Sequence, residues 1–236
     1  MKAEAYFIND MKVTALLPMK RHSERVPDKN MRTFVDEPLF YKILSVLDRS
    51  ALIDKIIVNT DSELIAKMAK EKSDKIVIHI RSEELIGDYV SMNRIIKYDL
   101  EHSDADVYLQ THSTNPLLKQ ETIDTAIKKY FEAVKRGCDS LFSVTRYQNR
   151  LYDSKGNPVN HDPHKLLRTQ DLPVLFEENS CLYIFSRDSF SNNQDRRIGA
   201  RPFMYEIDKI EAVDIDTNED FLVAESLYKI YVEKGP

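Results

Sequence analysis

Short apolar runs alternate with longer amphipathic segments along most of the chain. Runs rich in β-branched and aromatic residues predict strands at residues 12–18, 55–60, 75–80, 106–110, 139–145, 181–186 and 202–207. Apolar residues three or four positions apart predict helices at residues 38–50, 62–72, 95–102, 121–137 and 217–234. Because strands and helices alternate from the start, we expect an α/β protein with a mostly parallel sheet and right-handed crossovers.

The ends of the predicted helices carry local signals. Pro38 is expected at the first position of its helix, where a missing N–H costs nothing. Gly137 is expected to stop the helix over 121–137, because glycine readily takes the left-handed conformation that ends helices. Thr217 and Asp220 fit the cap and the capping-box partner of the last helix.

One stretch breaks the alternating pattern. Residues 146–173 are polar, rich in turn-forming residues and aperiodic, and they are too many for an ordinary connection. We expect them to form a protruding arm within a single domain over residues 1–236, acting as a dimer contact or a lid. The alternative is an insertion without fixed structure.

Composition narrows the class of protein. The 236 residues are 42% hydrophobic and 31% charged, which is typical of a globular protein with a sizeable core. The net charge of −5 argues against a general nucleic-acid or membrane-surface partner. The chain shows neither a membrane-spanning apolar run nor a signal-peptide core, so we expect a cytoplasmic protein. Cys138 and Cys181 lack metal-site spacing and are expected to be buried free thiols.

Positive charge gathers in the loop after the first predicted strand. Residues 19–37 contain no glycine, which excludes the phosphate-binding loops that depend on glycine backbone amides. Side chains must therefore hold any phosphate here, and we expect a triphosphate to be held by Lys20, Arg21, Ser23, Arg25, Lys29 and Asn30. The alternative is a solvated loop in which Glu24, Asp28 and Asp36 pair with the bases.

A second chemical signal is the alternating run Asp214, Ile215, Asp216. In an extended segment both aspartates project to one side while the isoleucine turns to the core. Two neighbouring carboxylates repel each other unless a cation lies between them, and Mg²⁺ accepts a few carboxylates while keeping waters and phosphate oxygens. The alternative is that Asp216 caps the last helix and Asp214 lies in a surface turn.

Four segments together resemble a known family. They are "SERVPDKN", "VNTDSELIAK", "YLQTHSTNPL" and "AVDIDTNEDFLVAE", and they are similar in order and spacing to the acidic-sugar cytidylyltransferases, the CMP-N-acetylneuraminate synthetase family. The resemblance implies a three-layer α/β/α, Rossmann-like nucleotidyltransferase fold of the nucleotide-diphospho-sugar transferase type. It also implies an enzyme in which a 2-keto-3-deoxy sugar acid attacks the α-phosphate of CTP, giving a CMP-sugar and pyrophosphate. From the aspartate pair we expect Mg²⁺ as the cofactor, and from the arm we expect a homodimer.

The resemblance and the loop charge together assign roles to residues. The expected catalytic residues are Lys20, Arg25 and Asp216, and the expected metal ligands are Asp214 and Asp216. Arg81 joins the basic loop in binding the nucleotide. The sugar acid is expected to meet Gln110, Arg168, Gln170 and Asn179.

One position departs from the family pattern. The family usually has Lys after the serine of the first segment, whereas this chain has Glu24, so Arg25 is expected to take over its role. His112 is expected to be a structural or contact residue rather than a general base.

Three alternatives stay open for the function. Instead of a sialic-type acid, the enzyme could activate another ulosonic acid such as 3-deoxy-manno-octulosonate, legionaminate or pseudaminate. The chain could also be a non-catalytic nucleotide-binding homologue, or a glycosyltransferase that uses a preformed nucleotide sugar and releases no pyrophosphate.

Overall fold

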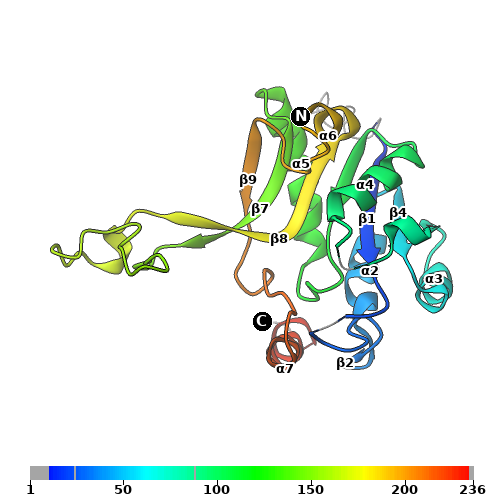
Figure 1. Cartoon of the computed structure of the whole chain (residues 1–236), viewed down its shortest axis with the longest axis horizontal. Coiled ribbons are helices and arrows are strands. Elements are labelled where there is room, and N and C mark those ends of the chain that lie inside the picture. The colour runs from blue at the N-terminus through cyan, green and yellow to red at the C-terminus, as the bar shows by residue number, and fades with distance from the viewer. Residues whose placement is uncertain (1–10, 24, 88, 234–236) are drawn as a thin grey trace.

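A seven-stranded sheet forms the centre of the computed structural model, which describes residues 11–23, 25–87 and 89–233 (Figure 1). The strand order is β5-β4-β1-β6-β8-β7-β9. The strands are β1 (Val13–Met19), β4 (Lys55–Thr60), β5 (Ile76–Ile80), β6 (Val107–Gln110), β7 (Ser140–Tyr147), β8 (Leu175–Ser186) and β9 (Pro202–Glu206). Each predicted strand has its counterpart in this sheet.

The sheet is mostly parallel, as predicted. β1 runs parallel to β4 and β6, β4 parallel to β5, and β7 parallel to β9. β8 alone runs antiparallel to its neighbours β6 and β7. Its direction follows from its connection, because β7 and β8 are joined as a hairpin and strands joined in this way must be antiparallel.

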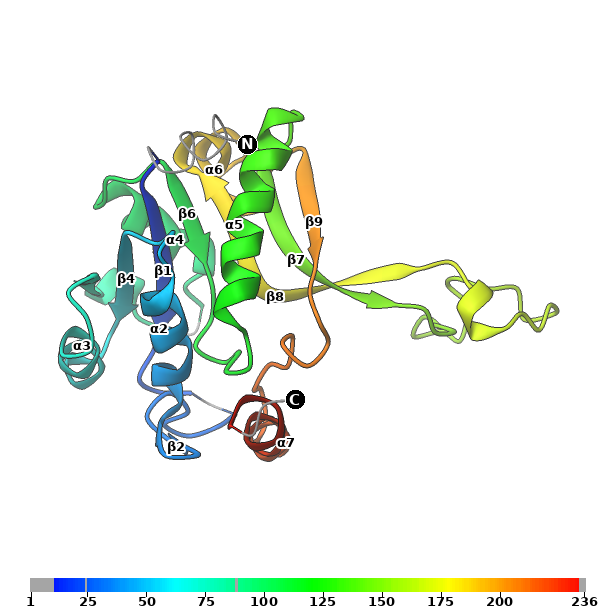
Figure 2. The ribbon, with the colours of Figure 1, turned by 180° about the vertical axis from the view of Figure 1, so that it is seen from behind.

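Helices cover both faces of the sheet, so the protein has three layers (Figures 1 and 2). One face packs against α2 (Leu39–Arg49), α3 (Glu63–Lys70) and α5 (Gln120–Lys135). The other face packs against α4 (Met92–Glu101) and α6 (Arg187–Asn192). The fold predicted from the alternating pattern and the family resemblance is therefore confirmed.

Strand β1 shows how the sequence builds these layers. All seven of its residues are buried, and neighbours along the strand point to opposite faces. Ala15 and Leu17 belong to the core on the α2 and α5 side, whereas Leu16 packs on the α4 side. A strand buried on both faces is fixed in register, so the loop that follows Met19 emerges at a defined point on the carboxyl edge of the sheet.

The helix ends follow the local sequence signals, except that one helix begins one residue later than predicted. Gly137 has φ +91°, and Thr217 and Asp220 form a complete capping box at the start of α7 (Asn218–Tyr228). The prediction for Pro38 is wrong by one residue, since α2 begins at Leu39 and Pro38 is its extended N-cap residue. Pro38 takes this conformation because it also pairs in the small hairpin of β2 (Thr33–Phe34) and β3 (Glu37–Pro38).

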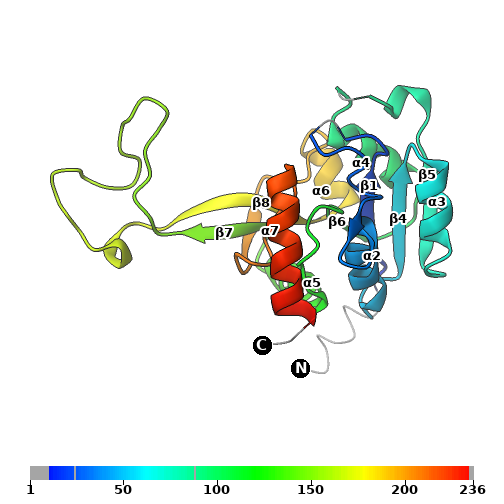
Figure 3. The same cartoon turned by 90° about the horizontal axis from the view of Figure 1, so that it is seen from below.

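The residues predicted to form an arm do project from the body of the protein (Figure 3). The outer parts of β7 and β8 pair with each other, from Val144 opposite Glu178 to Tyr147 opposite Leu175. Beyond them the chain is held by Asn160, which is buried and whose amide donates to the backbone oxygens of Asn149 (2.8 Å) and Pro173 (3.2 Å).

Two compositional expectations can be compared with the structure. Cys138 and Cys181 are both free, but only Cys181 is buried and Cys138 is half-buried, so the expectation was wrong about the burial of Cys138. In the part of the chain that the structure describes, no helix combines the length and the apolar character needed to cross a membrane.

Candidate active site

A cleft of about 520 Å³ opens at the carboxyl edge of the sheet, beyond β1 and β6. Ligands of open α/β sheets bind at this edge, and the volume is within the range of small-molecule sites. Many of its residues belong to segments singled out in the sequence. The lining residues are Pro18, Met19, Lys20, Ser23, Arg25, Lys29, Asn30, Met92, His112, Ser113, Thr114, Ser180, Arg197, Asp214 and Asp216.

The first loop turns Lys29 into the cleft. Val26 is fully buried and anchors the loop, and Asp28 takes a left-handed conformation (φ +49°) in the turn before Lys29. The Lys29 ammonium donates to the backbone oxygen of Ile215 at 2.5 Å and lies 3.9 Å from Asp216 Oδ1. Burial lowers the pKa of Lys29, although the charges of Asp214 and Asp216 act in the opposite direction.

Asn30 braces the loop. Its side chain is buried, and its amide nitrogen donates to the backbone oxygen of Lys20 at 2.8 Å. Its amide oxygen accepts a hydrogen bond of 2.6 Å from Ser113 Oγ. Asn30 therefore ties the end of β1 to the segment after β6, and it also lines the cleft.

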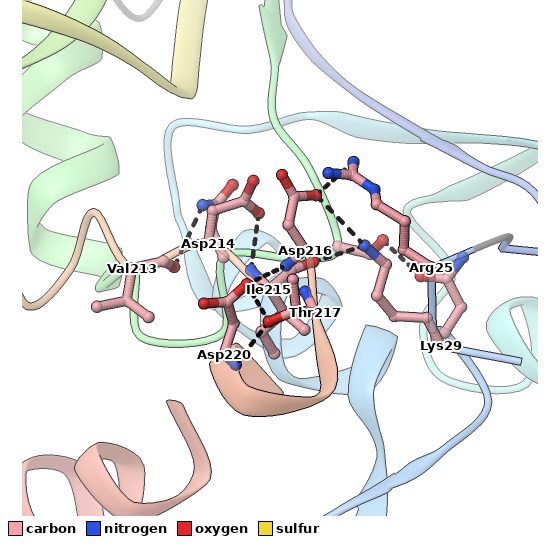
Figure 4. A network of polar contacts seen from close by, with 11 residues as sticks. Arg25, Lys29, Val213, Asp214, Ile215, Asp216, Thr217 and Asp220 are labelled. Carbon is pink, nitrogen blue, oxygen red and sulfur yellow. Dashed lines mark hydrogen bonds and ion pairs between the residues drawn. The ribbon is translucent and has the colours of Figure 1, made fainter. Parts of the chain in front are cut away.

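The two aspartates lie as their alternation predicts (Figure 4). Ile215 is fully buried against Phe34, Leu117 and Phe221, while Asp214 and Asp216 line the cleft. The segment is extended without being a strand, and the Ile215 N–H donates to the backbone oxygen of Thr114. Asp216 does not cap α7, because Thr217 occupies the cap position.

The aspartate pair is in contact with positive charge from the first loop. Asp216 Oδ1 lies 2.7 Å from Arg25 Nη2 in an ion pair that is about half exposed. The Asp214 side chain opens into the cleft, yet the protein around it desolvates the carboxyl group and raises its pKa, and the nearby charge of Asp216 acts in the same direction. A cation bound at the pair would relieve this repulsion.

The pair offers part of a metal site. Within the described ranges, no three or more His, Cys, Asp or Glu side chains form a group that could hold a metal ion. Two carboxylates beside an open cleft nevertheless fit Mg²⁺, which commonly takes one or two protein carboxylates and fills its remaining positions with water and phosphate oxygens. Arg25 contacts one of these carboxylates, so it must share or leave Asp216 when a cation binds.

Sequence reasoning missed a second basic group in the cleft. Arg197 lies 3.8 Å above the ring of Tyr183 and donates from Nη1 to Gln110 Oε1 at 2.5 Å. Gln110 is fully buried and in turn donates to His112 Nε2 at 3.0 Å. Burial, then the charges of Arg197 and Lys29, lower the pKa of His112 to about 4 and keep its imidazole neutral.

His112 is thus a contact residue of the cleft wall, in agreement with the sequence analysis. Arg197 left no signal in the sequence, because its segment has no periodicity and its partners Gln110 and Tyr183 are far away along the chain.

The other predicted nucleotide residues lie outside the cleft lining. Arg21 is exposed, and its backbone N–H donates to Asp61. Arg81 is buried against β4, where its Nε donates to Asn59 Oδ1 at 2.8 Å. Burial lowers the pKa of Arg81. Glu24, the position of the family departure, lies outside the described residues.

The four predicted sugar-acid residues are also absent from the cleft lining, and Gln110 is the fully buried residue described above. Asn179 is bonded to Ser143 and Thr145, and it is its neighbour Ser180, at φ +59°, that lines the cleft. Arg168 belongs to the arm and pairs with Asp171 at 2.7 Å. Gln170 also belongs to the arm, which projects from the body of the protein (Figure 1).

Comparison with known proteins decides the family. A sequence model described as cytidylyltransferase matches residues 14–234, nearly the whole chain. The chain belongs to the cytidylyltransferase family. The resemblance to acidic-sugar cytidylyltransferases is confirmed by relatives of this family that carry such names.

Three relatives illustrate the range of acids. The N-acylneuraminate cytidylyltransferase A of Danio rerio is 28% identical over 90% of this chain and 50% of its own length. The pseudaminic acid cytidylyltransferase of Campylobacter jejuni is 25% identical over 95% and 100%. The 3-deoxy-manno-octulosonate cytidylyltransferase of Chlorobium phaeovibrioides is 26% identical over 75% of each chain. The chain spans about half the length of the N-acylneuraminate cytidylyltransferases that it matches.

Solved structures support the fold of this cytidylyltransferase. A CMP:2-keto-3-deoxy-manno-octonic acid synthetase complexed with CTP superimposes with a TM-score of 0.68 at 12% identity, covering 94% of this chain and 100% of that one. A 4-diphosphocytidyl-2C-methyl-D-erythritol synthase from Anaerococcus prevotii gives 0.66 at 14% identity, over 95% and 99%.

Proposed function

We propose that this chain transfers the CMP group of CTP to a 2-keto-3-deoxy sugar acid and releases pyrophosphate. The anomeric oxygen of the acid forms a bond to the α-phosphorus, the bond from that phosphorus to the bridging oxygen breaks, and the hydroxyl proton is lost. The observation that carries the proposal is the Asp214 and Asp216 pair, which shares one cleft with the basic first loop. Membership of the cytidylyltransferase family supports it.

The basic residues of the first loop are assigned to the triphosphate. Lys20, Arg25 and Lys29 line the cleft, and their charges offset the negative charge that grows on the leaving pyrophosphate. Ser23 lines the same cleft and can donate to a phosphate oxygen. Because Asn30 fixes this loop to the end of β1, the cationic groups are positioned before the nucleotide arrives, which lowers the ordering cost of binding.

Asp214 and Asp216 are assigned to Mg²⁺. When bound, the ion would neutralise phosphate charge and lower the pKa of the acceptor hydroxyl. Asp216 is also our candidate to accept the hydroxyl proton, since its carboxylate lines the cleft beside the phosphate-binding residues. Arg25 shifts from Asp216 to the triphosphate as the nucleotide binds, which is the role expected of it in place of the family lysine.

A sialic-type acid is our first candidate for the acceptor. Support comes from the N-acylneuraminate cytidylyltransferases among the relatives. Pseudaminic acid and 3-deoxy-manno-octulosonate follow, because relatives with these names are similar to the chain to nearly the same degree. We infer a cytoplasmic location, where CTP is supplied and free thiols such as Cys181 stay reduced.

We further propose a homodimer built on the arm. Large apolar side chains are exposed on the arm and on the adjoining part of β8, and a second copy is the partner that we infer for them. These residues are Tyr152, Val159, Leu166 and Leu167 on the arm and Phe176 on β8. In such a dimer Arg168 and Gln170 of one copy can approach the cleft of the other. Light scattering gives the number of copies per particle for the full chain and for a variant with residues 150–172 replaced by a short Gly-Ser turn. The full chain should be a dimer and the variant a monomer, and an unchanged number of copies would refute the proposal.

Pyrophosphate release tests the reaction. The full chain with Mg²⁺ is offered each of the four nucleoside triphosphates against N-acetylneuraminic acid, pseudaminic acid and 3-deoxy-manno-octulosonate. We expect release with CTP and one acid, and none when either is omitted. Turnover of a preformed CMP-sugar without pyrophosphate would instead indicate a glycosyltransferase, and CTP binding without release would indicate a non-catalytic homologue.

A further inference from the structure

We propose that Arg197 anchors the carboxylate of the acceptor acid within the chain's own cleft, and that Gln110 acts by positioning Arg197. The inference rests on the proposed function, since it concerns the acid of that reaction. It differs from the direct contact between Gln110 and the acid that the family resemblance implied, because Gln110 acts here through Arg197.

Among the described residues, the guanidinium of Arg197 has no ion-pair partner. In the described parts of the chain no carboxylate lies within ion-pair distance of it, although the group is half-buried and lines the cleft. Glu178, whose charge acts on Arg197, accepts instead a short hydrogen bond from the Tyr183 hydroxyl. A desolvated cation without a counter-ion is costly, so a ligand that supplies one negative charge here is favoured.

Gln110 holds this guanidinium in one orientation. Its amide nitrogen donates to the backbone oxygen of Thr111 and to His112 Nε2, both at 3.0 Å, so its oxygen must face Arg197. The Tyr183 ring fixes the plane of the guanidinium from below. A guanidinium has five N–H groups in a rigid fork. With one Nη1 hydrogen engaged by Gln110, the fork can still present two parallel donors, which match a carboxylate.

The position of Arg197 separates it from the triphosphate site. Arg197 rests on side chains of β6 and β8, whereas Lys20, Arg25 and Lys29 follow β1 on the other side of the cleft. His112 lines the same cleft, and the charges of both Arg197 and Lys29 act on it. The cleft thus has two cationic sides, which suits a reaction between two anions. The acceptor, which carries the single carboxylate, fits the side with the single cation.

The test measures the apparent KM for each substrate separately in Arg197→Met, with Arg196→Met as the matched control. Arg196 is the exposed neighbour and does not line the cleft. We expect Arg197→Met to raise the KM for the acid by about 100-fold and the KM for CTP by less than about 3-fold, because a bidentate charged contact is lost on the acid side alone. Arg196→Met should leave both values within about 2-fold of wild type.

Three further measurements separate anchoring from a structural role. Wild type should prefer the acid strongly over its carboxamide, and Arg197→Met should remove most of that preference, which a loosened fold would not do selectively. Arg197→Lys keeps the charge without the fork and should raise the KM for the acid by only about 10-fold. Gln110→Leu should also raise this KM while sparing that for CTP.

The outcomes distinguish the two proposals. If wild type releases pyrophosphate and Arg197→Met changes the KM for CTP, or changes neither KM, Arg197 does not anchor the acid and only this inference falls. If wild type releases no pyrophosphate with any of the three acids, the proposed function fails and the inference fails with it.

Discussion

Replacing Asp216 by asparagine is the sharpest test of the metal assignment. The substitution removes one negative charge and keeps the volume of the side chain. In the folded protein it removes the 2.7 Å ion pair with Arg25, whose side chain is 64% exposed while that of Asp216 is 45% exposed. A pair this exposed stabilises a protein by about 0 to 1 kcal/mol. Loss of repulsion toward Asp214 acts in the opposite direction, so the free energy of unfolding should change by less than about 1 kcal/mol.

Turnover should respond very differently. One of two protein ligands to the ion is lost, and the transition-state stabilisation that such an ion supplies is several kcal/mol. A loss of about 3 to 4 kcal/mol corresponds to a rate lower by a factor of about 100 to 1,000. Raising the Mg²⁺ concentration should recover part of the rate, because the remaining ligand Asp214 still lines the cleft.

The assay is pyrophosphate release at saturating CTP and acid over a range of Mg²⁺ concentrations, together with urea unfolding of the same samples. Asp208→Asn is the matched control, since Asp208 is exposed, lies outside the cleft and caps only a turn at Ile210. If Asp216→Asn keeps more than about a tenth of the wild-type rate, or loses its rate only because it unfolds, the assignment of Asp216 to the metal is refuted.

Three further predictions concern two residues of the cleft and one helix end. Asn30→Ala should lower the free energy of unfolding, measured in urea, by about 2 to 4 kcal/mol. The substitution leaves the Lys20 carbonyl and the Ser113 hydroxyl without their buried partner. A loss below about 1 kcal/mol would show that water replaces the amide. His112 has a folded pKa of about 4, below its unfolded value, so the stability it contributes is present above about pH 6.5 and lost as the pH falls toward 4. The His112→Gln variant should therefore lose less stability than wild type as the pH falls over that interval. An equal fall in melting temperature for the two proteins would refute the lowered pKa of His112. Gly137→Ala should lower the free energy of unfolding by about 1 to 2 kcal/mol, because alanine is strained at φ +91°. The added methyl would lie 3.6 Å from Arg201, which is ordinary contact, so backbone strain is the only cost; an unchanged melting temperature would contradict this account.

Local patterns in the sequence determined the elements and part of the site. The period of apolar residues located the seven strands, and short-range rules located Gly137 and the Thr217 capping box, because these features depend on residues within one or two turns. The same holds for Asp214 and Asp216, whose common side follows from the geometry of any extended chain. The glycine-free basic loop likewise lies where a loop after a first parallel strand must lie, at the carboxyl edge of the sheet.

Tertiary structure alone decided which polar side chains line the cleft and which are bonded within the protein. Asn30 and Gln110 were expected to touch substrate, and the structure shows that both are buried and bonded to protein, although Asn30 still lines the cleft. The hydrogen-bond partners of a buried amide come from whichever strands lie beside it. Arg81 is held by Asn59 for the same reason. Arg197 reaches the cleft only because β6 and β8, far apart in sequence, become neighbours in the sheet and bring Gln110 and Tyr183 together beneath it. Such contacts depend on strand order, which hydrophobic period does not encode.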